Sequence, residues 1–320
     1  NSIATRQRRR WEPAGVRLLM IFNPHASFRR AGRLLPAVRA ALRRFAEVDV
    51  LLTRCAGDAM EQVADADLSG YDGLLAAGGD GTLFEVLNGL YRHPPERRPP
   101  LGLVPVGTGN AFDRDIGLLP GDWEKGIELI AACRLRRVDV GRVAPVDLEG
   151  SGSADRSRPF HFLNIIGAGL PVDAMRAAER IKFIGRSAYS VAALWRALRL
   201  QTFPLVVELD GERLEQEALF VEIYNTRYTG TSFMMAPAAR LDDGLLDVTL
   251  VRRLARWRLL RLFPTIYTGR HVTYPEVTTR QASTITIRAP GGLALAPDGE
   301  FRGHAPVTVS CLHRDLEIFA

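Results

Sequence analysis

Lysine is nearly absent from this chain, which has two lysines, Lys125 and Lys182, among 42 lysine and arginine residues. Lysine binds phosphate in Walker-A loops, pairs with ATP phosphates in protein kinases and forms the Schiff base of many aldolases. Neither lysine lies in a G-x-x-x-x-G-K-[ST] or V-A-I-K motif, which argues against all three classes. Such a broad preference for arginine over lysine is more typical of genome composition than of function. We therefore use it only to exclude these lysine-dependent classes of protein.

Cysteine, long apolar runs and targeting signals are also scarce. Three separated cysteines in no C-x-x-C spacing argue against a disulfide framework or structural zinc and favour a reducing, cytoplasmic compartment. The six histidines form no H-E-x-x-H pair. No stretch approaches the roughly 18 apolar residues of a membrane-spanning helix. Residues 1–15 contain an arginine cluster and no apolar segment, so we expect a solvated basic tail and not a signal peptide.

The length of 320 residues and the apolar fraction of 47% suit a folded protein of two domains. In residues 16–143, short apolar runs alternate with amphipathic segments, which predicts a parallel sheet covered by helices on both faces. One helix is expected to begin at Thr82, because Thr82-x-x-Glu85 fits a capping box. The expected strands are 16–22, 48–53, 73–77, 101–106 and 136–143.

The pattern changes after residue 143. A Gly/Ser-rich, charged segment at 149–159 predicts a loop, and strand-like runs then dominate up to residue 320. Two helical insertions are expected, at 171–200 and 253–263. We therefore predict a mostly β second domain over 144–320, arranged as a sandwich. Its expected strands are 160–167, 205–209, 218–224, 246–251, 284–288, 293–296 and 307–311.

Two glycine-rich loops follow strands of the first domain. One surrounds Asp80 with Gly78, Gly79 and Gly81, and the other is Gly107-Thr108-Gly109-Asn110. Backbone N–H groups and a helix N-terminus can bind phosphate without lysine. Asp80 is unfavourable beside bare phosphate, but it can hold Mg²⁺ or a ribose hydroxyl. One such loop is as often a plain turn, whereas two at one sheet edge favour a nucleotide site.

Other candidates are ambiguous on residues alone. Asn23-Pro24 fits a turn or an amide facing a nucleotide, and Ser27 fits a helix cap or a phosphate ligand. Asp298-Gly299 is typical of a hairpin turn, and the chain has other Asp-Gly pairs, among them Asp72-Gly73, Asp210-Gly211 and Asp243-Gly244. By itself, therefore, this pair carries no special weight.

Several motifs in order resemble a known family. The segments are GGDGTLFEVLNGL, PLGLVPVGTGNAF, FLNIIGAGLPVDA, YNTRYTGTSFMMAPAARLDDGLLDVTLV, TGRHVTYPEV and APDGE. Together they resemble the catalytic domain shared by diacylglycerol, sphingosine and ceramide kinases and their bacterial lipid-kinase relatives, over about residues 16–320. GGDG alone also occurs in NAD kinases, but the ordered set is highly specific.

The resemblance implies a Rossmann-like α/β domain of the NAD-kinase and diacylglycerol-kinase type, followed by a β sandwich. It implies ATP-dependent phosphorylation of a lipid hydroxyl, on diacylglycerol, a sphingoid base, ceramide or a related lipid, with the site in the cleft between the domains. Asp298 is then the general base, Asp80 lies near catalytic Mg²⁺, and Glu300 is a metal ligand or supporting residue, with all three carboxylates candidate ligands of that Mg²⁺. The candidate nucleotide-binding residues are Asn23, Pro24, Ser27, Thr53, Gly78, Gly79, Gly81, Thr82, Gly107, Thr108, Gly109 and Asn110.

The chain also departs from the family. Asn110-Ala111-Phe112-Asp113 stands where Asn-Asp-Phe-Ala is common, so the acidic group has moved two positions. Phe28 replaces a glycine after Ser27, which predicts a differently shaped loop. Some relatives hold a structural Mg²⁺ near an Asp-Asp-Gly turn. Asp242 and Asp243 match that site only partly, and a plain turn fits equally well.

The expected partner is a lipid acceptor at the membrane surface, reached by peripheral association, with a homodimer left open. Arg252–Arg261 (RRLARWRLLR) fits a basic helix on anionic lipid or an ordinary helix with solvated arginines, and we favour the second. Residues 181–200 fit an acyl-chain pocket or core packing. The net charge of +6 and the spread arginines give no nucleic-acid signature. An NAD kinase-like enzyme and a catalytically silent nucleotide- or lipid-binding protein remain the alternatives.

Overall fold

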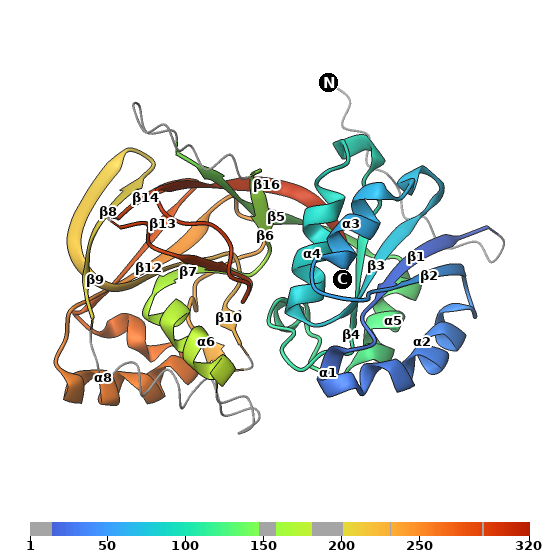
Figure 1. Cartoon of the computed structure of the whole chain (residues 1–320), viewed down its shortest axis with the longest axis horizontal. Helices are drawn as coiled ribbons and strands as arrows, with labels where there is room; N and C mark the ends of the chain where they lie inside the picture. The colour runs from blue at the N-terminus through green and yellow to red at the C-terminus, as the bar shows by residue number, and fades with distance from the viewer. Residues whose placement is uncertain (1–14, 147–157, 181–200, 231, 290) are drawn as a thin grey trace. The chain divides into compact units, whose positions relative to one another are not determined.

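The computed structural model describes residues 15–146, 158–180, 201–230, 232–289 and 291–320 (Figure 1). The chain forms two compact units. Unit 1 holds the chain up to Val138 together with Arg314–Ala320, and unit 2 holds Asp139–His313. The basic tail, most of the Gly/Ser-rich segment and the 181–200 segment lie outside the described residues.

Unit 1 is built on a parallel sheet in the order β2-β1-β3-β4. Strands β3 and β4 are buried along their whole length, as expected for strands covered on both faces. The end of β16 adds to this sheet, because Ile318 pairs with Leu101 in parallel. The strands are β1 (Arg17–Phe22), β2 (Glu47–Leu52), β3 (Gly73–Gly78), β4 (Leu101–Pro105) and β16 (Val307–Phe319).

Helices cover both faces of this sheet. Figure 1 shows α3 and α4 on one side of the strands and α2 and α5 on the other. The helices are α1 (Ala26–Arg29), α2 (Leu35–Leu42), α3 (Asp58–Asp65), α4 (Asp80–Leu90) and α5 (Trp123–Ala132). The predicted parallel α/β fold is therefore confirmed.

The capping-box prediction at Thr82 is wrong. Helix α4 begins at Asp80, and its first turn has no side-chain cap. The Glu85 carboxylate instead accepts N–H bonds from Gly57 and Ala59, at 2.7 and 3.0 Å. Glu85 thus stabilises the N-terminus of α3, where backbone donors and the helix dipole favour a negative charge.

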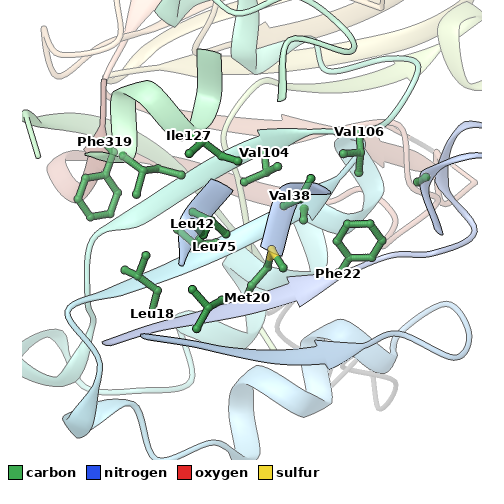
Figure 2. Close-up of a cluster of buried hydrophobic side chains, with 14 of the residues drawn as sticks. Leu18, Met20, Phe22, Val38, Leu42, Leu75, Val104, Val106, Ile127 and Phe319 are labelled. Carbon is green, nitrogen blue, oxygen red and sulfur yellow. The ribbon is translucent and has the colours of Figure 1, made fainter. Parts of the chain in front are cut away.

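The core of unit 1 lies between the sheet and the α2–α5 pair (Figure 2). Alternate residues of β1 point into it, as the period of two in a strand requires. Phe319, near the end of β16, belongs to the same cluster. The labelled members are Leu18, Met20, Phe22, Val38, Leu42, Leu75, Val104, Val106, Ile127 and Phe319.

Unit 2 is β-rich, as predicted. Its main sheet is antiparallel in the order β13-β12-β9-β8-β14-β16, and β7 pairs with the second half of β9 and with β15. The strands are β5 (Leu135–Pro145), β6 (Phe160–Phe162), β7 (Ile165–Gly169), β8 (Phe203–Leu209), β9 (Glu212–Tyr224), β10 (Tyr228–Thr229), β11 (Phe233–Met234), β12 (Leu246–Arg252), β13 (Val277–Ala282), β14 (Thr284–Arg288) and β15 (Leu295–Pro297).

Two α-helices are described in unit 2, α6 (Leu170–Arg180) and α8 (Arg256–Leu262). Helix α8 falls within the insertion expected at 253–263, and α6 begins one residue before the insertion expected at 171–200. The 3-10 helix η6 (Phe263–Tyr267) follows α8 directly. In the described part of the chain, no helix has the length and apolar character needed to cross a membrane.

Candidate active site

The two glycine loops touch each other at the carboxyl ends of β3 and β4. The Gly107 N–H donates to the Gly78 carbonyl at 2.9 Å. A Cβ on Gly107 would collide with the Cα of Gly79, and a Cβ on Gly78 would collide with the Thr82 side chain. Glycine is therefore needed at Gly107 for close backbone approach and at Gly78 to leave room for the Thr82 side chain.

Asp80 lies where the two loops meet. Its Oδ1 accepts the Ala111 N–H at 2.7 Å, and a Cβ on Gly109 would collide with its Oδ2. Burial raises the pKa of Asp80 to about 6, although the N–H groups of Ala111 and Asn110 act in the opposite direction. The carboxylate is thus held in place by the second loop.

Asn110 links the first loop to Asp113. Its backbone is left-handed, with φ of 54°, a conformation that asparagine tolerates. Its Nδ2 donates to the Gly78 carbonyl at 3.2 Å and to Asp113 Oδ2 at 2.8 Å. Burial raises the pKa of Asp113 to about 7, and the charge of Asp80 adds to this effect. The displaced acidic residue therefore lies beside the glycine loops.

The end of β1 supplies the remaining polar groups of this edge. Asn23 Nδ2 donates to Thr82 Oγ1 at 3.0 Å, and Asn23 Oδ1 accepts the His25 N–H at 2.9 Å. Ser27 Oγ donates to the Val106 carbonyl at 2.7 Å, just before the second loop. The structure thus brings these residues together with both loops.

The other predicted nucleotide residues lie at the same sheet edge. Pro24 follows Asn23, and Thr53 follows β2, with its N–H donating to the Phe22 carbonyl at 3.0 Å. Thr53 is buried and Thr108 is exposed. Gly81 lies in the first turn of α4. All the predicted nucleotide-binding residues therefore belong to unit 1.

Asp298 belongs to unit 2 and follows β15. Its Oδ1 accepts N–H bonds from Asn164 and Ile165, at 3.0 and 2.9 Å, and its Oδ2 accepts the Leu163 N–H at 3.0 Å. The Asp298 N–H donates to the Ile165 carbonyl at 2.8 Å. The residue is buried, with φ of 45°. This Asp-Gly pair therefore differs from a plain turn, because its side chain is fixed by a segment distant in sequence.

Glu300 closes the same turn but is exposed. Its N–H donates to the Pro297 carbonyl at 2.7 Å. Its side chain therefore lies outside the buried position that Asp298 occupies, and its metal role stays a prediction.

The Asp242-Asp243-Gly244 turn, also in unit 2, is held by protein groups. Asp243 Oδ1 accepts the Leu245 N–H at 3.0 Å. The buried Asp139 accepts the Gly244 N–H at 2.7 Å and contacts His313 Nδ1 at 3.0 Å. Among the described residues, no three potential ligand side chains gather in a way that could hold a metal. The structural Mg²⁺ stays a prediction.

The donor set around Asp80 nevertheless suits a nucleotide-bound Mg²⁺. Mg²⁺ commonly takes one or two carboxylates, with phosphate oxygens and water completing its shell. Asp80 and Asp113 supply two interacting carboxyl groups with raised pKa values, and a cation beside them would favour both ionised forms. Asn110 Oδ1 is a buried acceptor without a hydrogen-bond partner in the described structure.

Two polar pairs were missed by the sequence interpretation. One is Asp139 with His313, and the other is Glu222 with Tyr224, whose hydroxyl donates to Glu222 Oε2. The signal for Glu222 was a single charged residue inside an apolar strand. No comparable signal links Asp139 to His313, which are 174 positions apart.

Comparison with known proteins agrees with this arrangement. A family model described as "Diacylglycerol kinase catalytic domain" matches residues 17–143. A second, described as "YegS C-terminal NAD kinase beta sandwich-like domain", matches residues 164–320.

Relatives and solved structures match over nearly the whole chain. The diacylglycerol kinase of Staphylococcus carnosus is 28% identical and covers 95% of this chain and 94% of its own length. That of Mycobacterium tuberculosis H37Rv is 29% identical and covers 90% of each. A crystal structure of a diacylglycerol kinase from Bacillus anthracis has a TM-score of 0.75 at 27% identity, covering 95% of this chain and 96% of its own. The chain belongs to the bacterial diacylglycerol kinase-like family and is a lipid kinase.

Proposed function

We propose that this lipid kinase transfers the γ-phosphate of ATP to the free hydroxyl of a diacylglycerol. The observation that carries the proposal is the contact of two glycine loops around Asp80 at the edge where a parallel α/β sheet binds ligands. The relatives described above are diacylglycerol kinases, which supports diacylglycerol as the acceptor.

On the nucleotide side, backbone groups replace the missing lysine. The loops and the N-terminus of α4 present N–H donors and a positive partial charge to the phosphates. Asp80 and Asp113 would hold Mg²⁺, which neutralises phosphate charge when it is bound. Asn23 and Asn110 orient the loops through their amide hydrogen bonds.

On the acceptor side, Asp298 takes the proton of the lipid hydroxyl. The hydroxyl oxygen forms its bond to the γ-phosphorus as the bond to the β,γ-bridging oxygen breaks, and ADP leaves. The three N–H bonds from residues 163–165 fix the carboxylate, so little reorganisation is needed during the reaction.

Asp298→Asn tests this role. Asparagine tolerates the left-handed backbone, so we expect a folded protein. Loss of the base should lower kcat by about 10²–10⁴-fold, with little change in the KM for ATP. The measurement is transfer of label from γ-labelled ATP to diacylglycerol in detergent micelles.

Asp210→Asn is a matched control. Asp210 also begins an Asp-Gly turn, has φ of 46°, and accepts three hydrogen bonds from Ser283 and Thr284. We expect this variant to lose stability but to keep the wild-type kcat. Wild-type phosphotransfer by Asp298→Asn would refute the general-base assignment.

The same labelled ATP separates the alternatives. If the label appeared in sphingosine or ceramide and not in diacylglycerol, the acceptor would be that lipid and the diacylglycerol assignment would be wrong. The NAD kinase-like description of the second family model makes NAD the other acceptor to test. Absence of label from every lipid and from NAD would favour a silent binding protein.

A further inference from the structure

Helix α8 has two faces of different character. Leu259 and Leu262, with Leu254 just before the helix, belong to the core cluster of unit 2. Trp257 and Leu260, three positions apart and so on one side of the helix, are 57% and 46% exposed. The helix is thus anchored by its inner face, and its outer face presents two large apolar side chains to solvent.

The charge around this outer face is of one sign. Arg256 and Arg261 flank Trp257 and Leu260 on the helix, and both are exposed. The guanidinium of Arg261 lies 5.8 Å from the centre of the Trp257 ring. Neither arginine has a carboxylate partner in the part of the chain that the structure describes. We call Arg256, Trp257, Leu260 and Arg261 the α8 outer face.

The whole segment 252–276 shares this bias. It contains six arginines and a single acidic residue, Glu276, which is a formal difference of +5. Glu276 is already paired with Arg258 at 2.8 Å. A two-fold contact between copies would bring the same arginines against one another, so self-association is electrostatically disfavoured.

We propose that the α8 outer face docks on an anionic lipid bilayer, with Trp257 and Leu260 at the headgroup boundary. Arg256 and Arg261 contact lipid phosphates there. Exposed tryptophan and leucine beside arginine are the composition by which an interfacial helix binds such a surface. This rests on the proposed function, because it names how the kinase reaches its lipid acceptor.

Vesicle sedimentation of the full chain tests the proposal without catalysis. We expect binding to equimolar phosphatidylglycerol–phosphatidylcholine vesicles, weakening with salt, and little binding to phosphatidylcholine alone. A double variant, Arg256→Gln with Arg261→Gln, should lower the partition coefficient about 30-fold, from about one factor of five per charge. Trp257→Ser with Leu260→Ser should also reduce it.

The matched controls are the same types of substitution, two arginines to glutamine or two apolar residues to serine, made in unit 1. Arg43→Gln with Arg44→Gln, and Leu119→Ser with Leu135→Ser, alter exposed residues outside the α8 outer face. These controls should bind vesicles as the wild type does. All variants should phosphorylate diacylglycerol in detergent micelles at the wild-type rate, which verifies that they are folded.

Two results would overturn the docking proposal. One is a change of less than about twofold in vesicle binding by both α8 variants. The other is a wild-type dimer that the α8 variants dissociate, which would make this face a contact between copies. If the wild type binds vesicles but phosphorylates no lipid in micelles, the proposed function fails and the docking face stands.

Discussion

At the scale of the residue, Glu222 shows how position changes chemistry. It lies in β9, is 4% exposed, and accepts a hydrogen bond from the Tyr224 hydroxyl. Its neighbour across the strand pair is Gly167, whose missing side chain leaves room for the carboxyl group. Burial raises the pKa of Glu222 from 4.5 to about 7.

This pKa shift predicts a pH dependence of stability. The folded chain keeps the Glu222 proton to a higher pH than the unfolded chain does. The free energy of unfolding should therefore fall as pH rises from about 4.5 to about 7, by up to about 3 kcal/mol. Glu222→Gln should remove the Glu222 contribution to that slope in denaturant unfolding measured across this range, and it should leave the contribution of the same sign from Asp80 and Asp113.

Glu217→Gln is the control for the slope. Glu217 lies on the same strand but is exposed. Its replacement should leave the pH dependence as in the wild type. An unchanged slope in Glu222→Gln would mean that Glu222 titrates normally.

Individual site residues were predictable to different degrees. Gly78 and Gly107 could be identified because they lie in glycine-rich loops that follow strands, and a Cβ at either position would collide with a neighbouring residue. Asp298 looked like one Asp-Gly turn among several, since the N–H groups that fix it lie 133–135 positions away. Its importance came from the family motif, and the local pattern alone could not show it.

At the scale of the element, the contact between the two glycine loops makes a sharp prediction. A Cβ at Gly107 collides with backbone atoms of Gly79, which cannot move as a flexible side chain can. Gly107→Ala should lower the free energy of unfolding by about 1–3 kcal/mol and raise the KM for ATP. Denaturant unfolding and ATP titration of initial rates measure both effects.

Gly70→Ala is the control for this element. A Cβ there meets only the end of the Arg17 side chain, at 3.4 Å. We expect stability and KM close to those of the wild type. If Gly107→Ala had the same free energy of unfolding and the same KM for ATP as Gly70→Ala, the close packing of the loops would not matter for function.

Elements were predicted well where their pattern was local. Alternation of apolar runs and amphipathic segments located β1, β3 and β4. The start of α4 was misplaced because Glu85 binds the N-terminus of another helix, α3, and sequence spacing within α4 cannot show that. Strand β13 was not expected at all, since its middle residues are polar and exposed.

At the scale of the whole molecule, β16 is the strand shared by the two units. Its residues up to His313 belong to unit 2, where β14 pairs with it, and Ile318 pairs with β4 in unit 1. After residue 143, the sequence changes from alternating apolar and amphipathic segments to strand-like runs, and this change indicates where the β-rich pattern begins. It does not show this return, because the exposed polar residues His313, Arg314 and Asp315 interrupt the apolar pattern of β16, and nothing local marks the partner of the residues that follow them.

Phe319 shows how much the C-terminal end of β16 contributes to the stability of unit 1. The ring is 1% exposed, packs against Gly73 of β3, and belongs to the core of unit 1. Phe319→Ala should lower the free energy of unfolding by about 3–5 kcal/mol, measured by denaturant titration. The exposed Leu135→Ala should change it by less than about 0.5 kcal/mol. A small loss at Phe319 would show that β16 is dispensable for unit 1.

The shared strand also sets an order of events during synthesis on the ribosome. Domains usually fold as they emerge, the N-terminal one first. Here, residues 314–320 follow all of unit 2 in the chain, so the nascent unit 1 lacks Phe319 until unit 2 has been translated. Its last sheet neighbour arrives late, and its exposed β4 edge is a site where a chaperone or another nascent chain can bind in the interval.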